Sequence, residues 1–73
     1  MDNVNYDYVE LTDNINRGII VRMNGRYHYE YDREKKDWIR SGIMMEYFCD
    51  ESPAYGSYRE ITEEEAMKLI EEM

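Results

Sequence analysis

The dipeptide Asn24-Gly25 constrains the fold of this chain more than any other feature, because it predicts a tight β-turn. It lies between two runs rich in β-branched and aromatic residues, and both of its residues readily adopt the positive φ that short hairpin turns require. We therefore predict a β-hairpin over residues 18–31 and expect the rest of the chain to pack around it.

The hairpin has two candidate registers. A two-residue loop of the same dipeptide would set apolar side chains opposite polar ones. A three-residue loop over 23–25, with Gly25 in a bulge, pairs Val21 with Tyr27 and makes one face apolar throughout. We favour the bulged register because a one-residue slip would turn the apolar side chains away from the core. Its apolar face is Ile19, Val21, Tyr27, Tyr29 and Tyr31, and its outward face is Arg22, Arg26, His28 and Glu30.

The length of 73 residues predicts a single small domain over 1–73. Its bulk comes from eight Tyr, six Met, one Trp and one Phe, so we expect tyrosine rings to cover much of the core. The single cysteine, Cys49, excludes an intrachain disulfide and favours a reducing, cytoplasmic location. No apolar run approaches the roughly 18 residues that a membrane span needs, so we expect no membrane partner.

The formal charge of −8 argues against direct binding to nucleic acid, because a net anion is repelled by phosphates. The charge is unevenly distributed. Residues 14–42 carry seven basic and four acidic side chains, a balance of +3, whereas residues 50–73 carry eight acidic and two basic ones, a balance of −6. A basic hairpin between acidic ends indicates internal charge complementarity or a partner surface of mixed charge.

The segments on either side of the hairpin predict a β-meander. Alternating apolar and polar residues favour a strand over 4–11, with a bulge where the phase changes, and the turn-forming residues 12–17 lead back to the hairpin. Six consecutive charged residues, 32–37, predict an exposed loop, and the apolar signal that follows predicts a short fourth strand over 38–40.

The next segment favours a short helix over 42–49, with Ser41 as its N-cap. Its apolar stripe has helical spacing and consists of Ile43, Met44, Tyr47 and Phe48. A strand over 43–48 is the alternative. Residues 50–57, with a proline and a glycine, predict a loop.

The C-terminal segment predicts a helix over 63–72. Thr62 and Glu65 match a capping box, and the glutamates of the first turn favour the positive end of the helix dipole. The apolar stripe is Ala66, Leu69, Ile70 and Met73. A helix this short needs a docking surface, and we expect it to cover the apolar face of the hairpin. The predicted fold is α+β, a small antiparallel β-meander of three to four strands covered by a C-terminal helix.

The sequence favours neither catalysis nor metal binding. His28 is the only histidine, and no nucleophile motif accompanies it. Cys49 precedes two acidic residues, which disfavour a reactive thiolate. The glutamates at 63–65 point around the helix rather than toward one ion. We therefore predict a non-enzymatic protein without cofactor or metal.

By elimination, we expect a small protein-interaction or accessory module whose partner is another protein. The candidate interaction residues are Arg22, Arg26, His28, Tyr55, Tyr58, Glu63 and Glu64. The alternative is an acidic inhibitor that imitates nucleic acid and blocks a DNA-binding or nuclease protein, with the carboxylates of 63–65, 71 and 72 standing in for phosphates. Direct nucleic-acid binding through the hairpin is a third hypothesis, which the net charge opposes.

Overall fold

The computed structural model describes residues 5–73. In chain order its elements are β1 (Asp7–Leu11), β2 (Ile20–Asn24), β3 (Tyr27–Asp32), β4 (Asp37–Arg40), α1 (Met44–Phe48), β5 (Tyr58–Ile61) and α2 (Glu63–Glu71). The predicted α+β class, the hairpin and the C-terminal helix are confirmed. The first strand begins at Asp7, and the predicted start at residue 4 lies outside the described residues.

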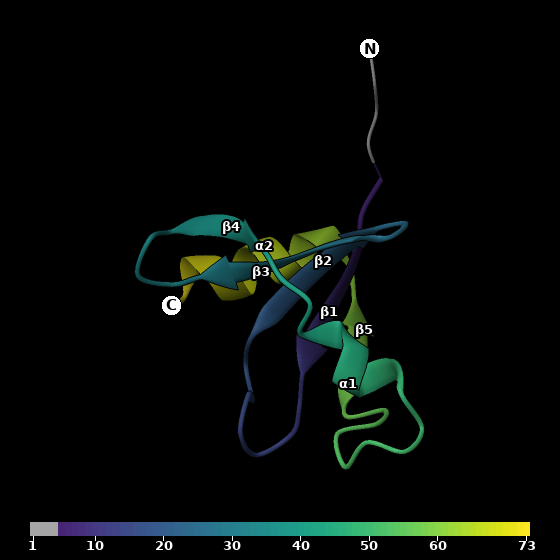
Figure 1. Ribbon diagram of the computed structural model, residues 1–73. Helices are drawn as coiled ribbons and strands as arrows, with labels where there is room; N and C mark the ends of the chain where they lie inside the picture. The colour runs from purple at the N-terminus through teal and green to yellow at the C-terminus, as the bar shows by residue number, and fades with distance from the viewer. Residues whose placement is uncertain (1–4) are drawn as a thin grey trace.

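The five strands form one antiparallel sheet in the order β4-β3-β2-β1-β5, so that β1 to β4 make the predicted meander (Figure 1). The fifth strand was not predicted. Tyr58 pairs with Leu11, and Ile61 pairs with Tyr8, so β5 covers the edge of β1 that the meander leaves free. The sequence analysis predicted no strand after the loop over 50–57, because β5 is only four residues long and its partner lies far away in the sequence.

The hairpin register differs from both predicted registers. Asn24 lies opposite Tyr27, and Met23 lies opposite His28, so the two residues of the turn are Gly25 and Arg26. Gly25 has φ of +62°, and Arg26 is not among the residues with positive φ. A single glycine with positive φ at the first turn position is the pattern of a type II′ turn. The predicted pairing of Val21 with Tyr27 is therefore wrong.

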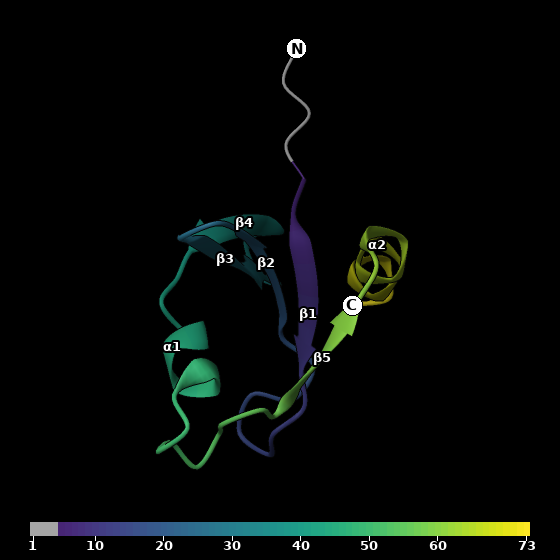
Figure 2. The ribbon, with the colours of Figure 1, turned by 90° about the vertical axis from the view of Figure 1, so that its right-hand side faces the viewer.

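Both faces of the sheet are covered, which explains why the register prediction failed. Figure 2 shows β1 between α1 and α2, with the two helices on opposite sides. Under α1, the buried side chains are Val9, Leu11, Val21, Met44 and Tyr47. Under α2, they are Tyr8, Ile20, Ile61 and Ala66. Because apolar side chains are needed on both faces, a search for the register with one apolar face selects the wrong pairing.

The predicted division of the hairpin into an apolar and an outward face is consequently wrong. Val21 packs under α1, whereas Tyr31 packs on the α2 side. Arg22 lies opposite Tyr29 and shares its face, while His28 lies on the other face beside Met23. The residues predicted to form one positive surface are thus divided between the two sides of the sheet.

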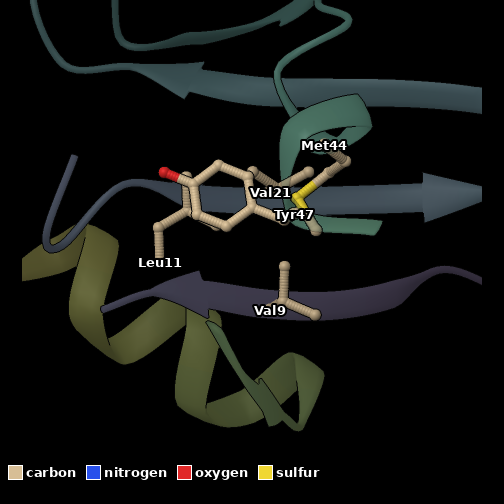
Figure 3. Close-up of a cluster of buried hydrophobic side chains, with 5 residues drawn as sticks. All are labelled: Val9, Leu11, Val21, Met44 and Tyr47. Carbon is tan, nitrogen blue, oxygen red and sulfur yellow. The ribbon is translucent and has the colours of Figure 1, made fainter. Parts of the chain in front are cut away.

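The short helix α1 confirms the helical interpretation of this segment and excludes the strand alternative. Ile43, rather than the predicted Ser41, is the N-cap, and the Ser41 hydroxyl accepts a hydrogen bond from the Ile43 N–H at 3.1 Å. Met44 and Tyr47 are fully buried against β1 and β2 (Figure 3). The Tyr47 hydroxyl donates to Asp13 Oδ1 at 2.6 Å. This buried ring fixes α1 on the sheet.

The helix α2 begins with the predicted capping box. The Thr62 hydroxyl accepts from the Glu65 N–H at 3.1 Å, and Glu65 Oε1 accepts from the Thr62 N–H at 2.9 Å. Ala66 is fully buried against the sheet, and Leu69 and Ile70 pack around it half-buried. No helix within residues 5–73 combines the length and the hydropathy needed to cross a bilayer.

Candidate functional site

The uncovered part of the α1 face carries a row of three side chains on neighbouring strands. Asp7 on β1 lies opposite Met23 on β2, and Met23 lies opposite His28 on β3. Neighbouring strands are about 4.8 Å apart, so Asp7 and His28 are separated by about 10 Å across the sheet. The row therefore has a negative end, an apolar middle and an imidazole end.

Phe48, at the end of α1, forms a wall beside this row. Its ring meets the His28 ring edge to face with centroids 6.1 Å apart, and it meets the Tyr58 ring in the same way at 5.6 Å. Tyr58 belongs to the unpredicted strand β5, so the cluster joins three elements that are distant in the sequence. Phe48 is nevertheless 48% exposed, so about half of this residue remains accessible to a partner.

These residues line an open hollow of about 560 Å³, which we call the acidic groove: Asp7, Met23, His28, Phe48, Tyr58, Glu60 and Glu63. Among its lining residues within the described chain, three are carboxylates and none is a lysine or an arginine. The volume lies within the range of ligand pockets, roughly 300–1,000 Å³. The groove combines aromatic walls with a negative rim.

A second hollow, of about 390 Å³, lies on the other side of His28, and we call it the basic hollow. Its lining residues are Arg26, His28, Arg40, Ser41, Gly42 and Met45. The Arg40 guanidinium stacks over the Tyr27 ring at 4.9 Å from its centroid. Met45 is 74% exposed. His28 therefore separates two concave surfaces of opposite charge, and exposed apolar side chains of α1 border both of them.

The structure brings together some of the predicted interaction residues and separates others. His28, Tyr58 and Glu63 all line the acidic groove, and Arg26 joins His28 in the basic hollow. Tyr55 is 55% exposed in the loop before β5, outside both hollows. Glu64 is exposed on the first turn of α2, also outside both.

Arg22 lies on the opposite face, in an aromatic cage. Its guanidinium carbon is 4.2 Å from the Tyr6 ring centroid, 4.5 Å from that of Trp38 and 5.6 Å from that of Tyr29. The Nε atom is buried and has no hydrogen-bond partner within the described residues. Cation–π attraction to the rings opposes the cost of this unpaired donor. Arg22 is therefore internal to the α2 face and cannot belong to the same contact surface as His28.

Sequence reasoning missed Phe48, Met45, Asp7 and Glu60. Phe48 was assigned to the apolar stripe of its helix, and that stripe correctly predicted the burial of Met44 and Tyr47. A five-residue helix has too little length to bury both ends of the stripe. Only the packed structure shows that Phe48 lies beyond the edge of the covered core.

One residue that lines the acidic groove, Tyr8, has a raised pKa. Burial is the main cause that raises the pKa of Tyr8, and the nearby Glu63 carboxylate acts in the same direction. Within residues 5–73, no three His, Cys, Asp or Glu side chains come together in a group that could hold a metal ion. The arrangement is suited to binding a charged and apolar partner by surface complementarity.

Comparisons of the chain with protein-family models, with curated proteins and with solved structures found no match. A functional proposal therefore rests on the structure, and in particular on the two hollows beside His28.

Proposed function

We propose that this chain is a small, non-enzymatic protein-interaction module. Its acidic groove binds a segment of a partner protein that carries a basic residue next to an apolar one. The observation that supports this proposal is the groove itself, in which exposed aromatic surface lies beside unpaired carboxylates.

Charge selects the kind of partner. Among the described residues, the only ion pair joins Arg59 to Glu10, so Asp7, Glu60 and Glu63 have no basic partner of their own there. The whole chain carries −8, which adds a long-range attraction for cationic segments. A lysine or arginine of the partner would find at this rim the opposite charges that the chain leaves unpaired.

The aromatic wall of the groove favours an apolar side chain next to the basic residue of the partner. Interface hot spots are enriched in aromatic residues that fill a pocket and lose contact with water. Phe48 meets this description because its ring is held by His28 and Tyr58 while about half of the residue stays exposed. An aliphatic or aromatic side chain of the partner can bury the exposed surface of Phe48.

The test is selection from a random peptide library displayed on phage, with the purified chain as bait. We expect enriched peptides to contain Lys or Arg within two residues of an apolar side chain. Synthetic versions should bind Phe48→Ala about tenfold more weakly or worse than the original chain. The matched control is Tyr55→Ala, which removes an exposed ring outside the groove and should leave affinity unchanged.

A second variant addresses the charges without touching the core. Asp7→Asn combined with Glu60→Gln changes two exposed residues, and selection on it should no longer enrich basic residues. Thermal unfolding of each variant verifies that the fold is intact. The proposal is wrong if no motif is enriched, if the motif is acidic, or if Phe48→Ala binds the selected peptides as tightly as the original chain.

The acidic inhibitor is the second candidate, because α2 and its C-terminus carry exposed carboxylates. Those of Glu63, Glu64, Glu71 and Glu72 are exposed, whereas that of Glu65 is engaged in the capping box. Titration of a basic nuclease with the chain tests this candidate. Inhibition that weakens when Glu63 and Glu64 are changed to Gln would support it, and unaltered nuclease activity at a large excess of the chain would exclude it.

A further inference from the structure

We propose that the outer edge of β4 pairs with the same edge of a second copy of this chain, so that the two sheets form one continuous antiparallel sheet. β4 is the last strand on its side of the sheet, and no described strand pairs with its outer edge (Figure 1). This pairing depends neither on the acidic groove nor on the partner proposed for it.

The outer edge of β4 presents the backbone groups of Trp38 and Arg40. Ser41 donates its N–H to the His28 carbonyl at 3.0 Å, so Ser41 and, two residues earlier, Ile39 turn their backbone groups toward β3. Because these directions alternate along a strand, the N–H and C=O groups of Trp38 and Arg40 point away from the sheet. Such a row of backbone groups is a template for another strand.

The side chains of β4 favour one symmetric register over the others. Outward-pointing residues must lie opposite one another, so a two-fold axis passes through residue 38, 39 or 40. An axis at 40 sets Arg40 opposite its own copy, which is a like-charge pair, and an axis at 38 sets Ile39 opposite Asp37. An axis at 39 sets Ile39 opposite Ile39 and Arg40 opposite Trp38. This register alone joins apolar to apolar and a cation to an aromatic ring.

Ile39 supplies the apolar contact of this register. It lies opposite Glu30 on the α1 side of the sheet, is half-buried, and belongs to neither of the two hydrophobic clusters. With the axis at 39, the two isoleucines form a non-hydrogen-bonded pair whose Cα atoms lie about 4.5 Å apart. Each copy therefore covers apolar surface that the other leaves exposed to water.

Asp37 and the net charge limit the strength of this pairing. The Asp37 carboxylate accepts a hydrogen bond from the Trp38 N–H at 2.8 Å, so this outward donor already has a partner within its own copy. Pairing replaces that bond by one to the Arg40 carbonyl of the second copy. Each copy also carries −8, and the two charges repel. We therefore expect a weak dimer that is strengthened by salt.

The symmetry of the pairing gives the dimer two binding sites on one side. The two-fold axis is perpendicular to the sheet, so equivalent faces of the two copies point in the same direction. Both acidic grooves then lie on the face that carries α1, and a partner with two basic segments would bind the dimer with higher avidity than one copy. This consequence rests on the proposed function, whereas the edge pairing is tested without any partner.

The first experiment locates the pairing by disulfide cross-linking of the full chain. Ile39→Cys is made in a Cys49→Ser background, because Cys49 is exposed and is the single native cysteine. A Cα separation of about 4.5 Å lies within the range of a disulfide, so we expect a cross-linked dimer under mild oxidation. The matched control is Asp37→Cys in the same background. Its two copies lie about 13 Å apart along the strands in this register and should remain largely uncross-linked.

The second experiment measures association by sedimentation velocity from micromolar to millimolar concentrations. We expect the original chain to dimerise reversibly. Arg40→Pro removes the outward N–H and leaves the bonds to β3, so it should weaken the dimer about tenfold. Arg40→Gln is its matched control, because it removes the charge and keeps the N–H, and it should weaken the dimer less. Asp37→Ala removes the competing acceptor of the Trp38 N–H and should tighten the dimer.

Each outcome decides for or against the pairing. A monomer at every concentration refutes a second copy as the occupant of this edge. Equal dimerisation of Arg40→Pro and Arg40→Gln, with the fold of both verified by thermal unfolding, refutes pairing through the backbone of β4. If Arg40→Pro does not fold, the cysteine variants decide, because cross-linking of Asp37→Cys as fast as that of Ile39→Cys refutes the register.

Discussion

Replacement of Tyr47 by phenylalanine tests whether the hydroxyl that anchors α1 stabilises the fold. The ring is fully buried, and its hydroxyl donates to Asp13 Oδ1 at 2.6 Å while accepting from Asn16 Nδ2 at 3.0 Å. The substitution retains the aromatic ring, which lies among the buried side chains in Figure 3. Asp13 and Asn16 are only half-buried, so water can replace part of what they lose. We expect the loss of the Tyr47 hydroxyl to lower the free energy of unfolding by about 1–2 kcal/mol.

For a domain of this size, such a loss corresponds to a fall in Tm of roughly 4–16 °C. The assay is urea unfolding at pH 7, followed by the fluorescence of the single tryptophan, Trp38. The slope of the free energy of unfolding against urea concentration should stay unchanged, because the substitution alters stability and not the surface exposed on unfolding. Tyr55→Phe is the matched control. It removes an exposed hydroxyl and should change stability by less than about 0.5 kcal/mol.

The pH dependence gives a second readout. The hydrogen bond from Tyr47 is the main cause that lowers the pKa of Asp13 below its ordinary value of 3.8. A lowered folded-state pKa contributes stability above the unfolded value and loses it as the pH falls through the folded value. Burial is the main cause that raises the pKa of Tyr47 above 10, so its contribution is lost as the pH rises beyond that value.

The loss of unfolding free energy in Tyr47→Phe, which we call its deficit, should therefore be largest between the pH ranges in which Asp13 and Tyr47 titrate. It should shrink below about pH 4. A deficit smaller than 0.5 kcal/mol at pH 7 would show that water replaces the hydroxyl completely. An equal deficit at pH 3 and pH 7 would show that the charge of Asp13 plays no part.

Two further substitutions test local features of the fold by the same unfolding assay. Thr62→Ala removes the side-chain half of the capping box and should lower stability by about 1 kcal/mol, whereas Thr62→Ser should restore most of it; equal stability of the Ala and Ser variants would contradict the role of this cap. Gly25→Ala should cost about 1 kcal/mol because Gly25 has φ of +62° in open space, so the penalty comes from the backbone alone. Gly42→Ala has equally open space without a positive φ and should be neutral or slightly stabilising, and an equal loss at both glycines would argue against backbone strain.

The elements that the sequence predicted correctly are those specified by local chemistry. The capping box at Thr62 and Glu65 depends on residues three apart, and it forms as predicted. The hairpin depends on a glycine that tolerates positive φ, and Gly25 adopts it. The short helix likewise follows from apolar spacing over a few residues. In each case the interacting groups are close in the chain, so the sequence pattern itself contains the contact.

The elements that were missed or misplaced depend on distant contacts. The strand β5 is stabilised by pairing with β1, whose residues lie some 50 positions earlier, and no local sequence pattern predicts this strand. Of the candidate site, the sequence singled out His28, Tyr58 and Glu63 but not Phe48, because an exposed aromatic and a buried one look alike in a helical stripe. Arg22 and His28 lie on opposite faces of the sheet because of the hairpin register, which the turn residues alone did not determine.

By itself the sequence determined the class of this protein. It specified a small acidic α+β domain with a central hairpin, a charged turn after it and a capped helix at the end, because propensity, capping and charge act between neighbours. Only the tertiary structure decided which side chains share a face. Since α1 and α2 cover opposite sides of one sheet, both faces needed apolar residues, and packing set the register. That register placed His28 between an acidic groove and a basic hollow.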